Sequence, residues 1–301
     1  MLQNVFQSFL IAAEKPKLGL WVTVAAGVTN MALDALFMAV FHWGVAGAAI
    51  ATGISQIVGG VLPLVYFLRP NSSLLQLTKT KLELRPILQA SGNGASELVS
   101  NVTASVVGML YNFQLLRLAG QNGVAAFGVL MYVEFIFAAV FIGYTIGCAP
   151  IVSYHFGAGN RGELQNLLRK SILLMGVGGL AMVGVAQGLA EPMARLFVGY
   201  DDTLCQMTVH AFRIATLSFV LVGFNIFASS FFTALNNGGV SAAISFLRTL
   251  VFQAASVILL PMALDVDGLW WAASAAEALA FVVSIGFLLA LKGKYHYFDE
   301  T

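Results

Sequence analysis

Long uninterrupted apolar runs constrain the fold of this chain more than any other feature. A helix needs about 20 mostly apolar residues to cross a bilayer. Only 10% of the residues are charged and 59% are hydrophobic, whereas a soluble domain carries about 25% charged residues. The sequence therefore predicts an all-α polytopic membrane protein with about eight full transmembrane helices, at residues 18–41, 45–68, 87–116, 123–150, 171–190, 206–235, 240–263 and 269–291. A further apolar stretch, residues 1–13, is too short to span.

Basic residues in the connections orient these predicted helices. With the turn at residues 14–17 placed inside, eleven Lys and Arg residues fall in inside connections and two, Arg117 and Arg195, fall in outside ones. Because cytoplasmic loops carry the excess of Lys and Arg, this bias places the C-terminus in the cytoplasm. The remaining two basic residues, Arg213 and Arg248, lie within predicted spans.

Composition and motifs exclude several classes of function. A net charge of +1 gives no electrostatic footprint for nucleic acid. Cys148 and Cys205 have no metal-ligand spacing, and no nucleophile–base arrangement or metal-ligand cluster is evident. We therefore expect neither an enzyme nor a resident cofactor, and the lipid bilayer is the first predicted partner.

A weak internal repeat divides the chain into similar parts. Residues 5–13 resemble residues 226–234, and residues 44–51 resemble residues 268–275, in the same order and with the same predicted direction through the membrane. A parallel repeat of this kind is typical of transporters built from two similar halves.

Five short segments carry a resemblance to a known family. They are NMALDALF at residues 30–37, WGVAGAAIATGISQ at 43–56, SEL at 96–98, APIVSYHFGAGN at 149–160 and SFLR at 245–248. Together they resemble the multidrug and toxic compound extrusion family, and within it the bacterial branch. The resemblance covers essentially the whole chain.

This resemblance implies a twelve-helix transporter plan of two six-helix lobes in the bacterial inner membrane. Family members exchange H⁺ or Na⁺ for organic cations or amphipathic drugs. On that plan residues 1–69 are a remnant of the N-terminal lobe, comprising the end of helix four and helices five and six. Residues 70–85 form the cytoplasmic inter-lobe linker, and residues 86–301 form the C-terminal lobe with helices seven to twelve. Helices one to three and most of helix four are expected to be missing.

The first candidate ion site lies in the N-terminal segment. Asn30 and Asp34 are four residues apart and share a helix face, and Thr52 lies on the returning helix. The resemblance implies that they match part of a first-lobe site for H⁺ or Na⁺, whose acidic partner on helix one is missing. The alternative is that Asp34 braces helix packing as a neutral, hydrogen-bonded acid.

Glu97 is the leading candidate in the C-terminal segment. It lies on a polar stripe with helical spacing that also contains Asn93, Ser100, Asn101, Ser105 and Asn112. A polar face on a membrane helix must look into a cavity or onto another helix. A carboxylate there would carry a proton, hold Na⁺ or attract a cationic drug; the alternative is a structural, hydrogen-bonding face.

Other ionisable and polar residues complete the predicted set. Glu134 and Tyr132 lie on different faces of the next helix, and Glu134 could meet Glu97 or pair with an arginine. Asn225 stands near the place where family members carry an acid on helix ten, which favours H⁺ over Na⁺ coupling here. The remaining residues are predicted to have structural or gating roles. Arg213 and His210 either snorkel to the interface or pair with acids. Arg248 forms either a buried ion pair, for which Glu277 is a candidate partner, or a gate on the inner side.

Three functions remain open from the sequence. The first is secondary-active efflux of organic cations or amphipathic drugs, in antiport with H⁺ or Na⁺. The second is flipping of a lipid-linked precursor, which the acidic excess among the intramembrane residues disfavours. The third is a truncated membrane subunit that does not transport.

Overall fold

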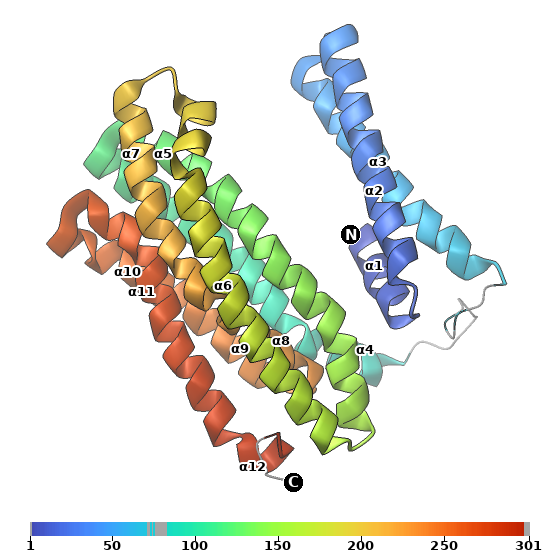
Figure 1. Cartoon of the computed structure of the whole chain (residues 1–301). Coiled ribbons are helices and arrows are strands. Elements are labelled where there is room, and N and C mark those ends of the chain that lie inside the picture. The colour runs from blue at the N-terminus through green and yellow to red at the C-terminus, as the bar shows by residue number, and fades with distance from the viewer. Residues whose placement is uncertain (1, 71–72, 74, 76–82, 298–301) are drawn as a thin grey trace. The chain divides into compact units, whose positions relative to one another are not determined.

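The computed structural model describes residues 2–70, 73, 75 and 83–297, apart from the side chains of residues 93, 95–97, 99 and 100. Within this part of the chain every regular element is helical (Figure 1). The helices form two compact units, Met1–Glu83 (unit 1) and Leu84–Thr301 (unit 2). Most of the predicted linker at residues 70–85 lies outside the described residues.

Unit 1 is a small helical group. It contains α1 (Leu2–Ala12), α2 (Pro16–Asp34), the π-helical turn η1 (Ala35–Val40) that continues α2, and α3 (Gly44–Leu68). Both α1 and α2 pack against α3. The long helices α2–η1 and α3 are apolar and long enough to cross a bilayer, whereas α1 is not.

Unit 2 is a larger helical bundle, and only short connections separate its helices along the chain (Figure 1). In chain order they are α4 (Leu84–Asn93), α5 (Ala95–Gly157), α6 (Arg161–Val198), α7 (Asp202–Ala215), η2 (Thr216–Ser218), α8 (Phe219–Ala234), α9 (Gly238–Phe246), η3 (Leu247–Phe252), α10 (Gln253–Leu259), α11 (Pro261–Ala290) and α12 (Lys292–Tyr295). The span formed by α7, η2 and α8 is the most buried of them, so it forms the centre of the bundle.

The long helix α5 reverses direction at Gly120. This residue has a left-handed φ of 64°, which glycine adopts without a steric penalty. The rings of Tyr111 and Phe127 stack with centroids 4.6 Å apart, whereas sixteen residues of straight helix would separate them by about 24 Å. Seven described helices have the length and composition to span, and the reversal divides one of them. The prediction of about eight transmembrane helices is therefore confirmed.

The N-terminal boundary predicted for α6 is wrong. The helix begins at Arg161, ten residues before the predicted start at residue 171. The side chain of Asn160 accepts a hydrogen bond from the backbone N–H of Glu163 (3.2 Å) and caps the helix. A capped polar first segment stays helical outside the apolar run, which hydropathy alone does not detect.

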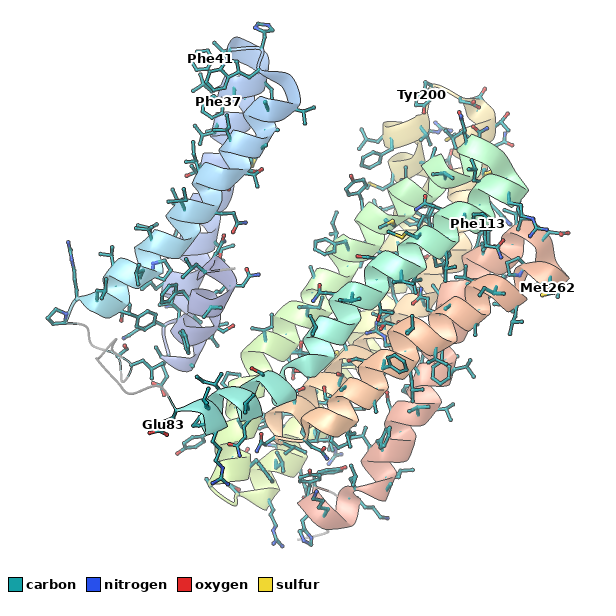
Figure 2. All side chains as sticks on the ribbon, turned by 180° about the vertical axis from the view of Figure 1, so that it is seen from behind. Phe37, Phe41, Glu83, Phe113, Tyr200 and Met262 are labelled. Carbon is teal, nitrogen blue, oxygen red and sulfur yellow. The ribbon has the colours of Figure 1, made fainter. Side chains whose placement is uncertain are left out.

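Unit 2 exposes large apolar side chains along its helices. Phe135, Leu180 and Val282 are 73%, 64% and 69% exposed, and Phe113, which is 68% exposed, points away from the bundle (Figure 2). Apolar exposure on this scale would drive association in water, and lipid is the solvent that covers it. The structure thus agrees with a multi-pass membrane protein.

The weak sequence repeat has a counterpart in helix packing. In unit 1, α1 and α2 both contact α3; in unit 2, the corresponding α8 and α10 both contact α11. In each unit the middle helix of the three contains a π-helical turn, which ends that helix in unit 1 (η1) and lies within it in unit 2 (η3). The repeated segments therefore fold into similar three-part groups, as a parallel repeat predicts.

Close approach of α6 to α8 depends on Gly179. A Cβ atom at this position would lie 2.7 Å from the carbonyl oxygen of Phe219, whereas one at Gly184 would have open space. We expect Gly179→Ala to lower the free energy of unfolding by about 1–3 kcal/mol through overpacking. The matched change Gly184→Ala should be neutral or stabilising. Thermal unfolding of the two purified variants in detergent checks this, and equal melting temperatures would contradict it.

Candidate functional site

A cavity of about 190 Å³ inside unit 2 has one acidic side chain, Glu134, among the described residues that line it. Residues from both halves of α5 and from η3, α10 and α11 line it, among them Tyr111, Phe127, Glu134, Thr249, Gln253 and Trp270. Drug pockets usually have volumes of about 300–1,000 Å³. This cavity therefore suits a small cation with water, or one cationic group of a larger molecule.

Aromatic rings form much of the cavity wall. Tyr111 and Phe127 stack on each other, and the Trp270 side chain is only 2% exposed. The negative faces of such rings attract cations, most strongly where water is excluded. Together with a carboxylate, these walls are suited to an organic cation.

The Glu134 carboxylate is available to a ligand. No described residue forms a hydrogen bond or an ion pair with it. The charged group that acts on it electrostatically is Glu277, which carries a charge of the same sign. The predicted alternative in which Glu134 pairs with an arginine is not observed among the described residues. A cation that enters the cavity would be attracted by this carboxylate and would neutralise its negative charge.

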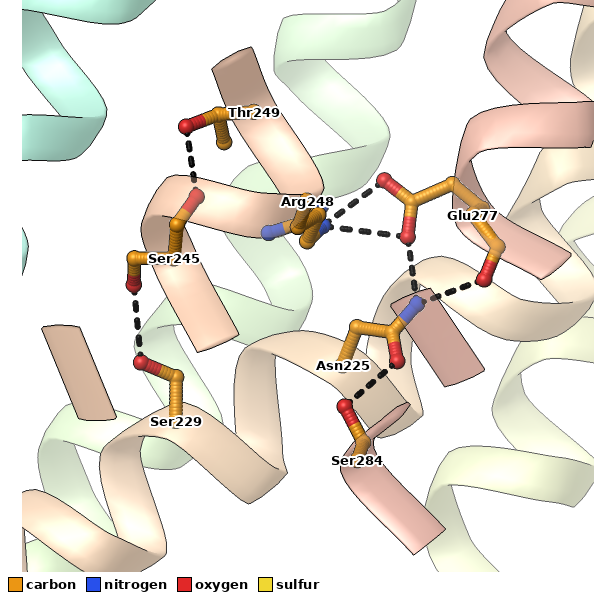
Figure 3. Close-up of polar contacts among 7 residues, drawn as sticks. All are labelled: Asn225, Ser229, Ser245, Arg248, Thr249, Glu277 and Ser284. Atoms are coloured by element: carbon orange, nitrogen blue, oxygen red, sulfur yellow. Dashed lines mark hydrogen bonds and ion pairs between the residues drawn. The ribbon is translucent and has the colours of Figure 1, made fainter. Parts of the chain in front are cut away.

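Beside the cavity, Arg248 and Glu277 form a buried ion pair (Figure 3). Arg248 Nε donates to Glu277 Oε1 (2.8 Å) and Oε2 (3.0 Å). The side chains are 19% and 7% exposed. The structure thus confirms the pairing of Arg248 with Glu277 that the sequence left open.

Asn225 completes this network rather than facing the cavity. Its Nδ2 donates to Glu277 Oε2 (2.7 Å) and to the Glu277 backbone carbonyl (3.0 Å), and Ser284 Oγ donates to Asn225 Oδ1 (3.0 Å). Both amide hydrogens of Asn225 therefore bond to Glu277, and its amide oxygen bonds to Ser284. These contacts hold neighbouring helices together, whereas the sequence predicted that Asn225 binds an ion. A carboxylate at this place would face Glu277 at hydrogen-bonding distance and repel it.

A cluster of hydroxyl groups joins α8 to α9. Ser229 Oγ lies 2.9 Å from Ser241 Oγ and 3.0 Å from Ser245 Oγ, and Thr233 Oγ1 donates to Ser241 Oγ (2.7 Å). Ser245 in turn accepts a hydrogen bond from Thr249 Oγ1 at its backbone carbonyl (Figure 3). Such groups hold membrane helices together. The sequence signal was the spacing of four between Ser241, Ser245 and Thr249.

The predicted stripe around Glu97 is only partly described. The backbone of Glu97 belongs to α5, but its side chain lies outside the described residues. Asn101 is exposed on unit 2, and Asn112 Nδ2 donates to its own helix at the carbonyl of Gly108 (2.8 Å). Tyr132 is 70% exposed. Neither Asn101 nor Tyr132 lines the cavity that holds Glu134.

In unit 1 the structure brings two of the three predicted residues together. Asn30 Nδ2 donates to Thr52 Oγ1 at 3.5 Å. Asp34 makes no hydrogen bond with either, and its buried Oδ1 has no hydrogen-bond partner in the described part of the chain. Asp34 directly precedes the π-helical turn η1, a feature often found at functional sites.

At the end of unit 2 where α7 begins, His210 pairs with an acid as predicted. His210 Nε2 lies 2.9 Å from Asp267 Oδ1, with both side chains about half exposed. Arg213 is exposed, lines an open depression of about 680 Å³ with His210, and forms no ion pair with a described residue. These contacts favour structural roles at this end.

Comparisons with known proteins assign the chain to a family. The MatE family model matches residues 98–258, more than half of the chain. Multidrug export protein MepA of Staphylococcus aureus is 20% identical over 293 residues, which are 96% of this chain and 64% of MepA. MepA of Staphylococcus haemolyticus is 22% identical over 238 residues, 78% of this chain and 51% of that protein. The chain thus spans less than two thirds of the length of these relatives.

Solved structures share the fold. A crystal structure of MATE in complex with MaL6 aligns with a TM-score of 0.89 at 22% identity, over 97% of this chain and 67% of that one. The Vibrio cholerae MATE transporter VcmN aligns with a TM-score of 0.87 at 22% identity, over 99% and 67%. The chain therefore belongs to the MatE family, whose members are multi-pass membrane transporters and not enzymes.

Proposed function

We propose that this chain acts in secondary-active multidrug efflux, exchanging H⁺ or Na⁺ for organic cations or amphipathic drugs. The observation that carries this proposal is the Glu134 carboxylate, which pairs with no described residue, in an aromatic-walled cavity of unit 2. Membership of the MatE family and the similarity to MepA, a multidrug export protein, support it.

The coupling follows from competition at one carboxylate. An ionised Glu134 attracts an organic cation, and a proton or Na⁺ on the same group removes that attraction. Binding of either ligand therefore weakens binding of the other, and the effect is reciprocal. Rocking of the two lobes about their repeat axis would expose the site alternately to each side of the membrane.

A proton is the coupling ion that the described site favours. Glu134 is the one carboxylate among the described residues that line the cavity, and Asn225, near the place where family members carry an acid, cannot titrate. A proton needs one carboxylate, whereas Na⁺ needs several oxygen ligands. Glu97 and Asp34 remain proposed as further acids of the transport path, with Asn30 and Thr52 beside Asp34 and with Asn101 and Tyr132 on the surface of unit 2.

Arg248, Glu277 and Asn225 are proposed as a structural brace beside the cavity. The fixed ion pair keeps Arg248 away from Glu134 and so leaves that carboxylate free to bind a cation. The distribution of basic residues supports a cytoplasmic C-terminus in a bacterial inner membrane.

Efflux by cells that make this chain tests the proposal. A bacterial strain without its own drug exporters, loaded with ethidium, should lose the dye faster with the chain than with an inactive membrane control. A protonophore should abolish the difference, whereas removal of Na⁺ should not. Dye loss equal to the control would contradict transport by this chain and favour a membrane subunit that does not transport.

A further inference from the structure

A second cavity of unit 2, of about 180 Å³, is lined by basic residues. It lies where α5 ends and α6 begins, against α12, at one end of the helical bundle (Figure 1). His155, Arg161, Lys294 and His296 supply two permanent positive charges and two imidazoles. No carboxylate of the described residues lines it.

The two permanent charges of this basic pocket are not neutralised by the described residues. Neither Arg161 nor Lys294 forms an ion pair with a described residue, and Lys294 Nζ lies 5.1 Å from the centre of the Tyr295 ring. His155 Nδ1 is buried and has no hydrogen-bond partner among the described residues. Adjacent unpaired cations repel each other, so an anion between them would be stabilising.

The neighbouring backbone adds to the positive potential and fixes the shape of the pocket. Gly159, with φ of +68°, turns the chain from α5 into α6, and the N-terminus of the 38-residue helix α6 carries a partial positive charge. On the other side, Tyr295 is held by a hydrogen bond from Asn237 Nδ2 (2.9 Å) and by ring contact with Phe156. The turn at Gly159 therefore forms one side of the pocket, and the ring of Tyr295, held in place by its contacts, forms the other.

We propose that this basic pocket binds the phosphate of an anionic phospholipid headgroup. Guanidinium and ammonium groups form charge-assisted hydrogen bonds to phosphate oxygens, and basic pockets between membrane helices on the cytoplasmic side bind anionic headgroups. The cationic substrates proposed for the Glu134 cavity would be repelled here, so the site is separate and does not depend on transport.

Lipid binding to the purified full chain in neutral detergent tests this proposal. We compare phosphatidylglycerol, phosphatidylcholine and inorganic phosphate by native mass spectrometry and by thermal unfolding. Phosphatidylglycerol should bind and raise the melting temperature. In Arg161→Gln/Lys294→Gln its affinity should fall about tenfold or more, because each charge-assisted hydrogen bond is strong. If this variant does not fold, Lys294→Gln alone should show a smaller loss.

The matched control is Arg169→Gln/Lys170→Gln. It removes the same charge from the exposed surface of α6 without touching the pocket, and it should bind phosphatidylglycerol as the unmodified chain does. Equal losses in both double variants would mean non-specific attraction and would overturn the proposal. So would equal binding of phosphatidylcholine, or stabilisation by inorganic phosphate to which phosphatidylglycerol adds nothing.

Discussion

Replacement of Arg248 by methionine is expected to lower the free energy of unfolding by about 3–5 kcal/mol, because it leaves the buried Glu277 carboxylate without its counter-ion. Glu277 is 5% exposed, and its remaining described partner is the amide of Asn225. Without Arg248, the Glu277 carboxylate still bears the free-energy cost of its removal from water but no longer gains the attraction of a neighbouring positive charge. Chemical unfolding in detergent micelles, followed by tryptophan fluorescence, measures the difference.

The double variant Arg248→Met/Glu277→Gln separates the ion pair from simple loss of packing. It removes both charges together and keeps a side-chain oxygen at residue 277 to accept the hydrogen bond from Asn225. We expect most of the lost stability to return, because neutral replacements of a buried pair are often tolerated. A double variant as unstable as the sum of the two single changes would contradict the pairing as the source of the effect.

Glu134→Gln is expected to reduce energised dye efflux about tenfold or more, since 1.4 kcal/mol of lost interaction already corresponds to tenfold. Glutamine is nearly isosteric with glutamate, yet it neither carries a charge nor exchanges a proton. Thermal stability should not fall, because the Glu134 carboxylate has no described partner to lose.

Glu191→Gln is the matched control for this change. Glu191 lies in α6 on the exposed surface and pairs with Arg195 within one helical turn, where such pairs contribute little. Its efflux should equal that of the unmodified chain. Glu97→Gln belongs in the same assay: normal efflux with Glu134→Gln and lost efflux with Glu97→Gln would move the site to the stripe around Glu97.

The sequence predicts most of the fold because membrane helices follow from local composition. Apolar length locates each span, and Gly120 lies within the turn expected between two of them. The early start of α6 escaped prediction because it depends on the side-chain cap at Asn160, and its polar first segment looks like a loop. The break at Asp265 in α11, with φ of 48°, likewise lies within the connection expected between residues 263 and 269.

The site is only partly predictable, because contacts between helices depend on rotation and distance. Arg248 and Glu277 were recognised as costly charges in a membrane, but they are 29 residues apart and only the packing brings them together. The sequence does not mark Thr249, Gln253 and Trp270 as site residues, since single polar or aromatic residues in an apolar helix usually serve packing. The structure places them beside Glu134.

Equilibrium binding of a fluorescent organic cation to the purified chain, measured across pH with and without Na⁺, tests most directly whether Glu134 is the shared site. We expect binding to weaken as the pH falls and Na⁺ to have little effect. Glu134→Gln should bind weakly at every pH, while Glu191→Gln should behave as the unmodified chain. Binding that keeps its strength and pH dependence in Glu134→Gln would contradict a shared site at Glu134.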